Sequence, residues 1–250
     1  MKKLEFIYEH GPHKWVAIAR DPTKASYLID TNEYLILNGE QAILTDPGGM
    51  EIFPDVFSAI DTEFNPNQIV GLFASHQDPD IISSLALWLE FNPKLKCYLS
   101  RLWTSFVPHF GGNADTFIAL PDDGTTFLLG NLELEAIPAH YLHSSGNFQL
   151  YDRKASILFS GDVGAALLPS ANAGLFVKDF DSHIQYAEGF HRRWMGSESA
   201  KLDWCERVSR LKIDMLCPQH GAIYRDNDVE RFINWLAELK IGTGIASQRT

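Results

Sequence analysis

The segment His76-Gln77-Asp78-Pro79-Asp80 constrains the fold of this chain most strongly, because it separates two apolar stretches of different character. Residues 69–74 are short and almost continuously apolar, which predicts a buried strand, whereas residues 81–89 have the apolar spacing of an amphipathic helix. One imidazole and two carboxylates at alternating positions of such a strand-to-helix corner can face a single point near the helix amino terminus. The segment therefore predicts a metal site in a fold that mixes strands and helices.

The composition sets broad limits on what the protein does. With 250 residues, of which 45% are hydrophobic, the chain can bury a full core. Its formal net charge is −11 and it has no run of Lys or Arg, so we expect neither nucleic acid nor an anionic membrane surface as a partner. The sequence has no stretch that resembles a signal peptide and no apolar window near the ~20 residues of a membrane span. We expect a cytoplasmic protein.

The three cysteines, Cys97, Cys205 and Cys217, are odd in number and far apart. They have no paired spacing, which argues against both a disulfide framework and a thiolate metal site. We expect buried, reduced thiols.

The pattern of apolar segments predicts a β-rich first half and a second half that repeats the theme. Strands are expected at 27–30, 33–38, 41–46, 69–74, 96–99, 126–129, 132–137, 147–151, 157–160 and 215–217. Helices are expected at 53–60, 81–89, 181–195, 198–211 and 229–239. Turns predict hairpins at Asn38-Gly39-Glu40 and for the two strands after Gly130-Asn131. We expect one layered domain over residues 1–250, with 241–250 as a mobile tail.

Three more predicted strands end in side chains that can bind a metal. Residues 136–144 include His140 and His143, residues 157–164 include Asp162, and residues 216–222 include His220. A lone histidine at a strand end more often forms a hydrogen bond or packs than binds a metal, but four such ends in one chain favour a metal site.

Each of these residues also has a purely structural interpretation. The first motif could be a solvated acidic loop in which Asp80 caps the following helix. Asp162 could begin a helix, and His220 could pack beside Pro218. His13, His109 and His183 are expected to be structural. The helix at 181–195 carries a mixed aromatic and basic segment at 188–195, which is either a half-buried amphipathic face or lies near the metal pocket, so the role of His191 is open.

The order and the sequence motifs of these segments resemble those of the metallo-β-lactamase superfamily. Within that superfamily they resemble the flavodiiron branch of dioxygen- and nitric-oxide-reducing proteins. The resemblance covers nearly the whole chain from the hairpin before Thr45-Asp46-Pro47-Gly48-Gly49. Hydrolytic members have His-x-His-x-Asp-His in the first motif, whereas flavodiiron proteins have a carboxylate at the third position, as Asp78 is here. The resemblance implies an α/β (α+β) fold, the four-layer αββα sandwich.

Carried over by position, the resemblance implies six ligands for two metal ions. The first metal would take His76, Asp78 and His143, the second would take Asp80 and His220, and Asp162 would bridge both. The sequence around His143 matches the family motif better than the sequence around His140. His140 is expected to support a ligand through a hydrogen bond. Oxygen and imidazole donors suit iron or manganese, and donor type alone leaves zinc open. We expect two iron ions (Fe2+/Fe3+) with bound dioxygen or an oxo or hydroxo bridge.

Two departures from the family pattern bear on the activity. Ile81 stands where the relatives have a histidine ligand, so the second metal is expected to have an open position. Only residues 240–250 follow the last predicted helix, so we expect no flavodoxin-like domain and no flavin within this chain. The chain thus looks like the stand-alone oxygen-binding diiron proteins of this superfamily, which are associated with chemotaxis and signalling. We expect binding of dioxygen, as a sensor or carrier, rather than catalysis.

Two other functions and two further partners stay open. The chain could be an oxidoreductase that reduces oxygen or nitric oxide with electrons from an external donor. It could also be a metal-dependent hydrolase, although the absence of histidine at positions 78 and 81 counts against this. A sensor without an output module needs a signalling protein as partner, and relatives commonly form homodimers.

Overall fold

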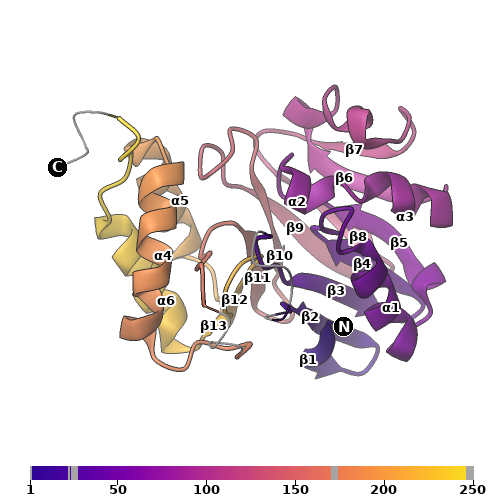
Figure 1. The fold of residues 1–250 in the computed structure, drawn as a ribbon, viewed down its shortest axis with the longest axis horizontal. Helices are drawn as coiled ribbons and strands as arrows, with labels where there is room; N and C mark the ends of the chain where they lie inside the picture. Colours follow the sequence, from indigo (N-terminus) through magenta and orange to yellow (C-terminus); the bar gives the residue numbers. More distant parts are fainter. Residues whose placement is uncertain (1, 22, 24–27, 170–173, 246–250) are drawn as a thin grey trace.

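The computed structural model describes residues 2–21, 23, 28–169 and 174–245. Within them, two β-sheets pack face to face between two groups of helices (Figure 1). The first sheet has the order β1-β2-β3-β4-β5-β6-β7, with β1 Lys3–His10, β2 His13–Ala19, β3 Glu33–Asn38, β4 Gln41–Thr45, β5 Ile69–Phe73, β6 Lys96–Ser100 and β7 Phe117–Leu120. The second has the order β13-β12-β11-β10-β9-β8, with β8 Thr125–Leu129, β9 Leu132–Pro138, β10 Phe148–Asp152, β11 Ile157–Gly161, β12 Met215–Pro218 and β13 Tyr224–Arg225.

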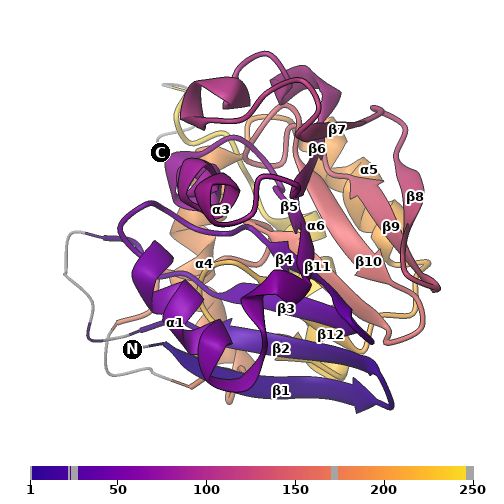
Figure 2. The same cartoon turned by 90° about the vertical axis from the view of Figure 1, so that its right-hand side faces the viewer.

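Helices cover the outer face of each sheet. The first sheet is covered by α1 Phe53–Glu63, α2 Pro79–Ile82 and α3 Leu85–Phe91, and the second by α4 Phe180–Trp194, α5 Glu198–Val208 and α6 Asn227–Glu238. Short 3-10 helices lie at Pro66–Gln68, Arg101–Trp103 and Val107–Phe110. Figure 2 shows β1, β2 and β3 side by side in the first sheet. The predicted four-layer αββα sandwich is confirmed, and no helix in the described ranges is long and apolar enough to cross a membrane.

The alternation of side chains along each strand builds this sandwich. In β2, Trp15 and Ala17 belong to the core between the sheets, whereas Val16 and Ile18 belong to the core under α1 to α3. A strand that is apolar at every position can serve both layers at once, because successive side chains point to opposite faces. The same rule explains why the sequence of the central strands shows no polar face.

Parallel pairing brings the functional loops to one edge. Strand β5 is parallel to β4 and β6, and β11 is parallel to β12. Parallel neighbours end at the same edge of their sheet, where the loops that follow them meet. The backbone N–H of Phe148 donates to the carbonyl of Ser75 at 2.9 Å, which joins the second sheet to the end of β5.

Several expectations about local structure are wrong. Residues 28–30 form no strand, and residue 27 lies outside the described residues. The helix predicted at 81–89 is divided into α2 and α3, because Ser84 donates from its hydroxyl to the carbonyl of Gly48 at 2.7 Å and turns the chain there. Strands β1, β2, β7 and β13 were not predicted, and the largely exposed β1 has no clear alternation.

The first residues of the segment expected to be a mobile tail pack against the rest of the protein. Ile241 is buried, and the backbone N–H groups of Gly242 and Thr243 donate to the carbonyls of Met195 and Arg192. This short segment is therefore attached to the end of α4, while residues 246–250 lie outside the described residues. The three cysteines are buried and free, as predicted.

Candidate metal centre

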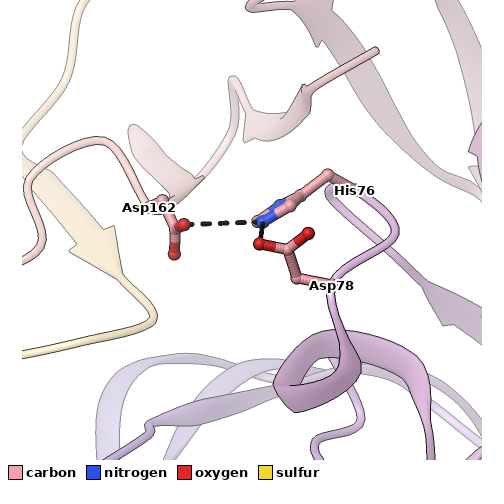
Figure 3. Close-up of side chains that lie close together, drawn as sticks. All are labelled: His76, Asp78 and Asp162. Carbon is pink, nitrogen blue, oxygen red and sulfur yellow. Dashed lines mark ion pairs between the residues drawn. The ribbon is translucent and has the colours of Figure 1, made fainter. Parts of the chain in front are cut away.

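The four polar strand ends meet at the edge where the two sheets approach each other. His76 follows β5, His143 lies in the loop after β9, Asp162 directly follows β11, and His220 follows β12. Figure 3 shows His76, Asp78 and Asp162 converging, with the imidazole of His76 facing both carboxylates. The structure thus brings together side chains from both sheets that are up to 144 positions apart in the sequence (76 to 220).

One group of donor atoms surrounds one oxygen of Asp162. The Nε2 atom of His76 lies 3.4 Å from Oδ2 of Asp162 and 3.4 Å from Oδ2 of Asp78. The Nδ1 atom of His143 lies 3.7 Å from the same Oδ2 of Asp162. These three residues and Asp162 are the four that the sequence assigns to the first metal.

A second group surrounds the other oxygen of Asp162. The Nε2 atom of His220 lies 3.3 Å from Oδ1 of Asp162 and 3.3 Å from Oδ2 of Asp80. Asp162 therefore stands between the two groups and faces each with a different oxygen. Asp162, His76 and His220 are buried, whereas the side chains of Asp78 and Asp80 are 41% and 28% exposed, so the site opens to solvent on the side of α2.

A buried chain of hydrogen bonds orients His76. Asp46, which is fully buried, accepts from the backbone N–H and from the hydroxyl of Ser75, both at 2.7 Å. Because the Ser75 hydroxyl donates to Asp46, its oxygen accepts from Nδ1–H of His76 at 2.9 Å. This fixes the tautomer that leaves Nε2 of His76 with a free lone pair directed at the site.

His220 is oriented in the same way by the backbone. Its Nδ1–H donates to the carbonyl of Asp30 at 2.7 Å, so its Nε2 has the free lone pair. The neighbouring Gln219 donates from its backbone N–H to the carbonyl of Gly161 at 2.8 Å and from Nε2 to the carbonyl of Asp80 at 3.0 Å. These bonds tie the loop of His220 to the strand end of Asp162 and to α2.

A tight loop with unusual backbone angles carries His143. Tyr141 and His143 have φ of 64° and 73°, which only a well-determined loop holds for residues other than glycine. Asn147 stabilises the loop by donating from Nδ2 to the carbonyl of Leu142 at 2.8 Å. Gln77 connects it to the first motif, since its Oε1 accepts from the Ser144 hydroxyl at 2.8 Å.

His140, His143 and Ile81 differ in what their side chains face. The Nε2–H of His140 donates to the carbonyl of Asp122 at 2.8 Å, whereas His143 faces Asp162. Ile81 is fully buried and belongs to the core under α1 to α3, so it offers no donor atom to the site. Asp78 is the residue before α2 and Asp80 lies in its first turn, so the structural alternative with Asp80 as helix cap is wrong.

The charges of the site are strongly coupled. Burial lowers the pKa of His76 and His220, but the neighbouring carboxylates, Asp162 foremost, outweigh it; the pKa of His76 is well above its ordinary value and that of His220 is raised to about 10. Burial raises the pKa of Asp162, yet these two imidazoles hold it well below its usual range. Burial lowers the pKa of His143 well below its ordinary value, and Asp162 only partly offsets this.

The donor set fits a pair of metal ions. Among the described residues, Nε2 of His76, both ring nitrogens of His143 and Oδ1 of Asp162 are buried without a hydrogen-bond partner, which is costly unless another group occupies the space between them. Donor atoms that lie about 2.1 Å from one ion at roughly 90–120° are about 3.0–3.6 Å apart. The observed separations of 3.3–3.7 Å match this spacing closely.

Sequence reasoning missed the residues that orient the ligand candidates, namely Asp30, Asp46, Ser75 and Gln77. Asp46 entered the sequence analysis only as part of the Thr45-Asp46-Pro47-Gly48-Gly49 resemblance. Its position as a carboxylate directly after an apolar strand could have indicated a role at the site. Asp30 acts through its backbone carbonyl, for which its side-chain type gives no signal.

Comparison with known proteins places these features in a family. Residues 29–221 match the model described as ODP family beta lactamase, which is more than half of the chain. The uncharacterized protein MJ0732 of Methanocaldococcus jannaschii is 23% identical over 223 residues, which are 82% of this chain and 52% of that protein. The chain therefore spans about half the length of this curated relative.

Solved structures agree with the family match. The structure described as the peroxy diiron species of chemotaxis sensor ODP is 38% identical with a TM-score of 0.86, over 99% of this chain and 100% of that chain. The apo state of chemotaxis sensor ODP from T. denticola is 39% identical with a TM-score of 0.88, over 99% of each chain. A flavo di-iron protein from Thermotoga maritima, at 20% identity and a TM-score of 0.81 over 95% of this chain and 61% of that chain, shares the fold. Since the family match includes every strand end that contributes to the cluster around Asp162, the chain belongs to the ODP family beta lactamases.

Proposed function

We propose that this protein is a non-haem diiron protein that binds dioxygen and acts as an oxygen sensor. The observation that carries the proposal is the position of Asp162, a single buried carboxylate that faces one group of donors with each of its oxygens. Full-length similarity, at 38% identity, to a chemotaxis sensor described as a peroxy diiron species supports the same function.

We assign the two metal positions to the two groups of donors. His76, Asp78 and His143 would hold the first ion, Asp80 and His220 the second, and Asp162 would bridge them. Iron at this site supplies the redox chemistry on which oxygen binding depends. The protein contributes three carboxylates, which offset the charge of two cations, and neutral imidazoles, whose orientation is fixed by Ser75 and by the Asp30 carbonyl.

Ile81 leaves a position for a small molecule in this arrangement. The second group has two donors besides the bridging carboxylate, and Ile81 adds none. An incompletely coordinated ion is the arrangement that binding of an exogenous ligand requires.

The proposal predicts a visible spectrum that depends on oxygen. Protein loaded with two irons per chain and reduced without air is expected to gain a visible absorption band on exposure to oxygen, with about one oxygen consumed per site. Stopped-flow absorption and an oxygen electrode on one sample measure both quantities. Absence of a new band would contradict the proposal, and sustained oxygen or nitric oxide consumption with an added electron donor would support the reductase instead.

A sensor must transmit its state to another protein, and we infer a signalling partner that recognises the oxygen-loaded form. We expect the partner to recognise the loop of His143, because this loop connects the site to Tyr141, which is 61% exposed. Hydrogen exchange on the oxygen-free and oxygen-loaded samples is expected to differ in residues 139–147. Identical exchange in the two states would argue against transmission through this loop.

Metal uptake is expected to release protons and to become tighter as the pH rises. In the metal-free protein the neighbouring carboxylates raise the pKa values of His76 and His220, to about 10 for His220. A metal must displace the protons that these imidazoles hold, so its affinity is expected to rise as the pH rises. Calorimetric titration with Mn2+ in two buffers of different ionisation enthalpy counts the protons. A count of zero would show that these imidazoles are neutral or do not bind the metal.

A further inference from the structure

His191 on α4 lies against the candidate metal centre but offers it no free nitrogen. It is fully buried, and its Nδ1–H donates to the carbonyl of Ala187, one helical turn earlier, at 2.9 Å. Its Nε2 accepts from the backbone N–H of Gly164 at 3.0 Å. Both nitrogens are therefore engaged and the ring is neutral, in line with burial lowering the pKa of His191 to about 4. A histidine in this state is not a metal ligand.

The bond from Gly164 places His191 directly on the loop of Asp162. Gly164 lies two residues after Asp162 and has a φ of 99°, which is readily adopted by glycine. Its carbonyl accepts from the Tyr224 hydroxyl at 3.1 Å, and the next N–H, of Ala165, donates to the carbonyl of Asp162 at 3.1 Å. Gly164 is thus held on both sides, and His191 is the side chain that holds its amide.

The same imidazole touches a second ligand candidate. The ring of His191 lies edge-on to the ring of His143, with a centroid distance of 5.2 Å and an interplanar angle of 88°. Its position is in turn fixed by Phe232 and Trp235 of α6, at 5.8 and 6.0 Å. His191 therefore contacts the loop of the shared carboxylate and the imidazole of the first group from one rigid location.

We infer that His191 is a positioning residue that fixes the loop of Asp162 relative to the imidazole of His143, and so slows the loss of metal from the site. The part of this inference that concerns metal rests on the proposed function. Removal of the acceptor at Nε2 leaves the Gly164 amide without its partner and lets the loop of Asp162 shift. Groups that support a ligand in this way commonly change metal affinity by about 10–100-fold.

Two variants separate the hydrogen bond from the packing. His191→Phe keeps a ring among Phe232 and Trp235 but has no acceptor, whereas His191→Gln places a carbonyl oxygen near the position of Nε2. We expect His191→Phe to speed exchange of the Gly164 amide in the metal-free protein and to speed metal loss to a chelator by about tenfold. His191→Gln is expected to restore most of both quantities.

The control is Gln185→Ala, at an exposed position of the same helix, where the side chain donates to the carbonyl of Asp181. It is expected to leave metal loss unchanged. Unaltered Gly164 exchange and metal loss in His191→Phe would overturn the inference, as would equal effects of His191→Phe and His191→Gln. If the unaltered protein retains no metal, the proposed function fails, while Gly164 exchange still tests the positioning of the loop. If His191→Phe does not fold, His191→Asn takes its place, because its shorter side chain puts no acceptor at the Gly164 amide. Faster Gly164 exchange and metal loss in His191→Asn than in Gln185→Ala support the inference, and equal rates overturn it.

Discussion

Replacement of Asp162 with asparagine is expected to reduce the metal content from two ions per chain to one or none. The two oxygens of Asp162 face different groups of donors, with His220 at 3.3 Å from one and His76 at 3.4 Å from the other. Asparagine keeps the size but has one oxygen, no charge, and an NH2 group that points a donor at an imidazole lone pair. We expect affinity to fall by more than about 100-fold, beyond the range usual for groups that only support a ligand.

Metal analysis after loading with iron and dialysis measures this effect, and the absorption band formed with oxygen is expected to disappear with it. Asp61→Asn, at an exposed position of α1, is the matched control and is expected to bind two ions. Retention of two ions by Asp162→Asn would remove Asp162 from the role of bridging ligand. The metal-free variant should also show a lower pKa for His76 and His220, because Asp162 is a main cause of their raised values.

The second large effect concerns stability and lies far from the metal centre. Asp152, at the end of β10, is fully buried and accepts from Nε2–H of His13 at 2.7 Å and Nε1–H of Trp15 at 2.8 Å, both on β2 of the other sheet. The backbone N–H groups of Lys154 and Ala155 also donate to it. Asp152→Ala leaves these donors buried and unpaired, which we expect to lower the free energy of unfolding by about 3–5 kcal/mol.

The contribution of Asp152 depends on pH in a defined direction. Burial raises its pKa, but the bonds from His13, Trp15 and Ala155 outweigh burial, so its pKa lies below the ordinary value. A group whose pKa is lowered by folding stabilises the protein above its unfolded pKa, about 4 for aspartate, and ceases to do so as the pH falls through the folded value. The difference between the unaltered protein and Asp152→Ala should thus be largest at neutral pH and shrink below about pH 4.

Urea unfolding at pH 7 and at low pH measures this difference. Asp203→Ala, which removes an exposed partner of Arg207, is the control and is expected to cost no more than about 1 kcal/mol. If Asp152→Ala lowered the free energy of unfolding at pH 7 by no more than Asp203→Ala does, the hydrogen bonds between the sheets would contribute little to stability.

Much of the candidate site follows from local patterns. A strand that is apolar throughout must end where polar side chains can reach solvent, so the residues directly after it, such as His76, Asp162 and His220, are displayed at a sheet edge. Histidine and aspartate are common metal ligands, and the order of the segments indicated the family. The predicted fold class followed because most strands of both sheets are apolar enough to be recognised alone, and because the order of the segments resembles that of the family.

Other features depend on contacts that no local pattern encodes. The division of the helix at 81–89 depends on a bond from Ser84 to the distant carbonyl of Gly48, and the absence of a strand at 28–30 accompanies bonds from Arg20 and His220 to Asp30. Strand β1 was hidden because it is mostly exposed and gains its place by pairing with β2.

The sequence by itself determined the layers of the fold, the donor types at the four strand ends, and the absence of a donor at Ile81. Only the tertiary structure decided that Asp162 stands between two groups of donors, that Ser75 and a backbone carbonyl orient the imidazoles, and that His191 holds the Gly164 amide. The physical reason is that residue type and periodicity are local properties, whereas a contact between segments distant in the sequence depends on how the sheets and helices pack.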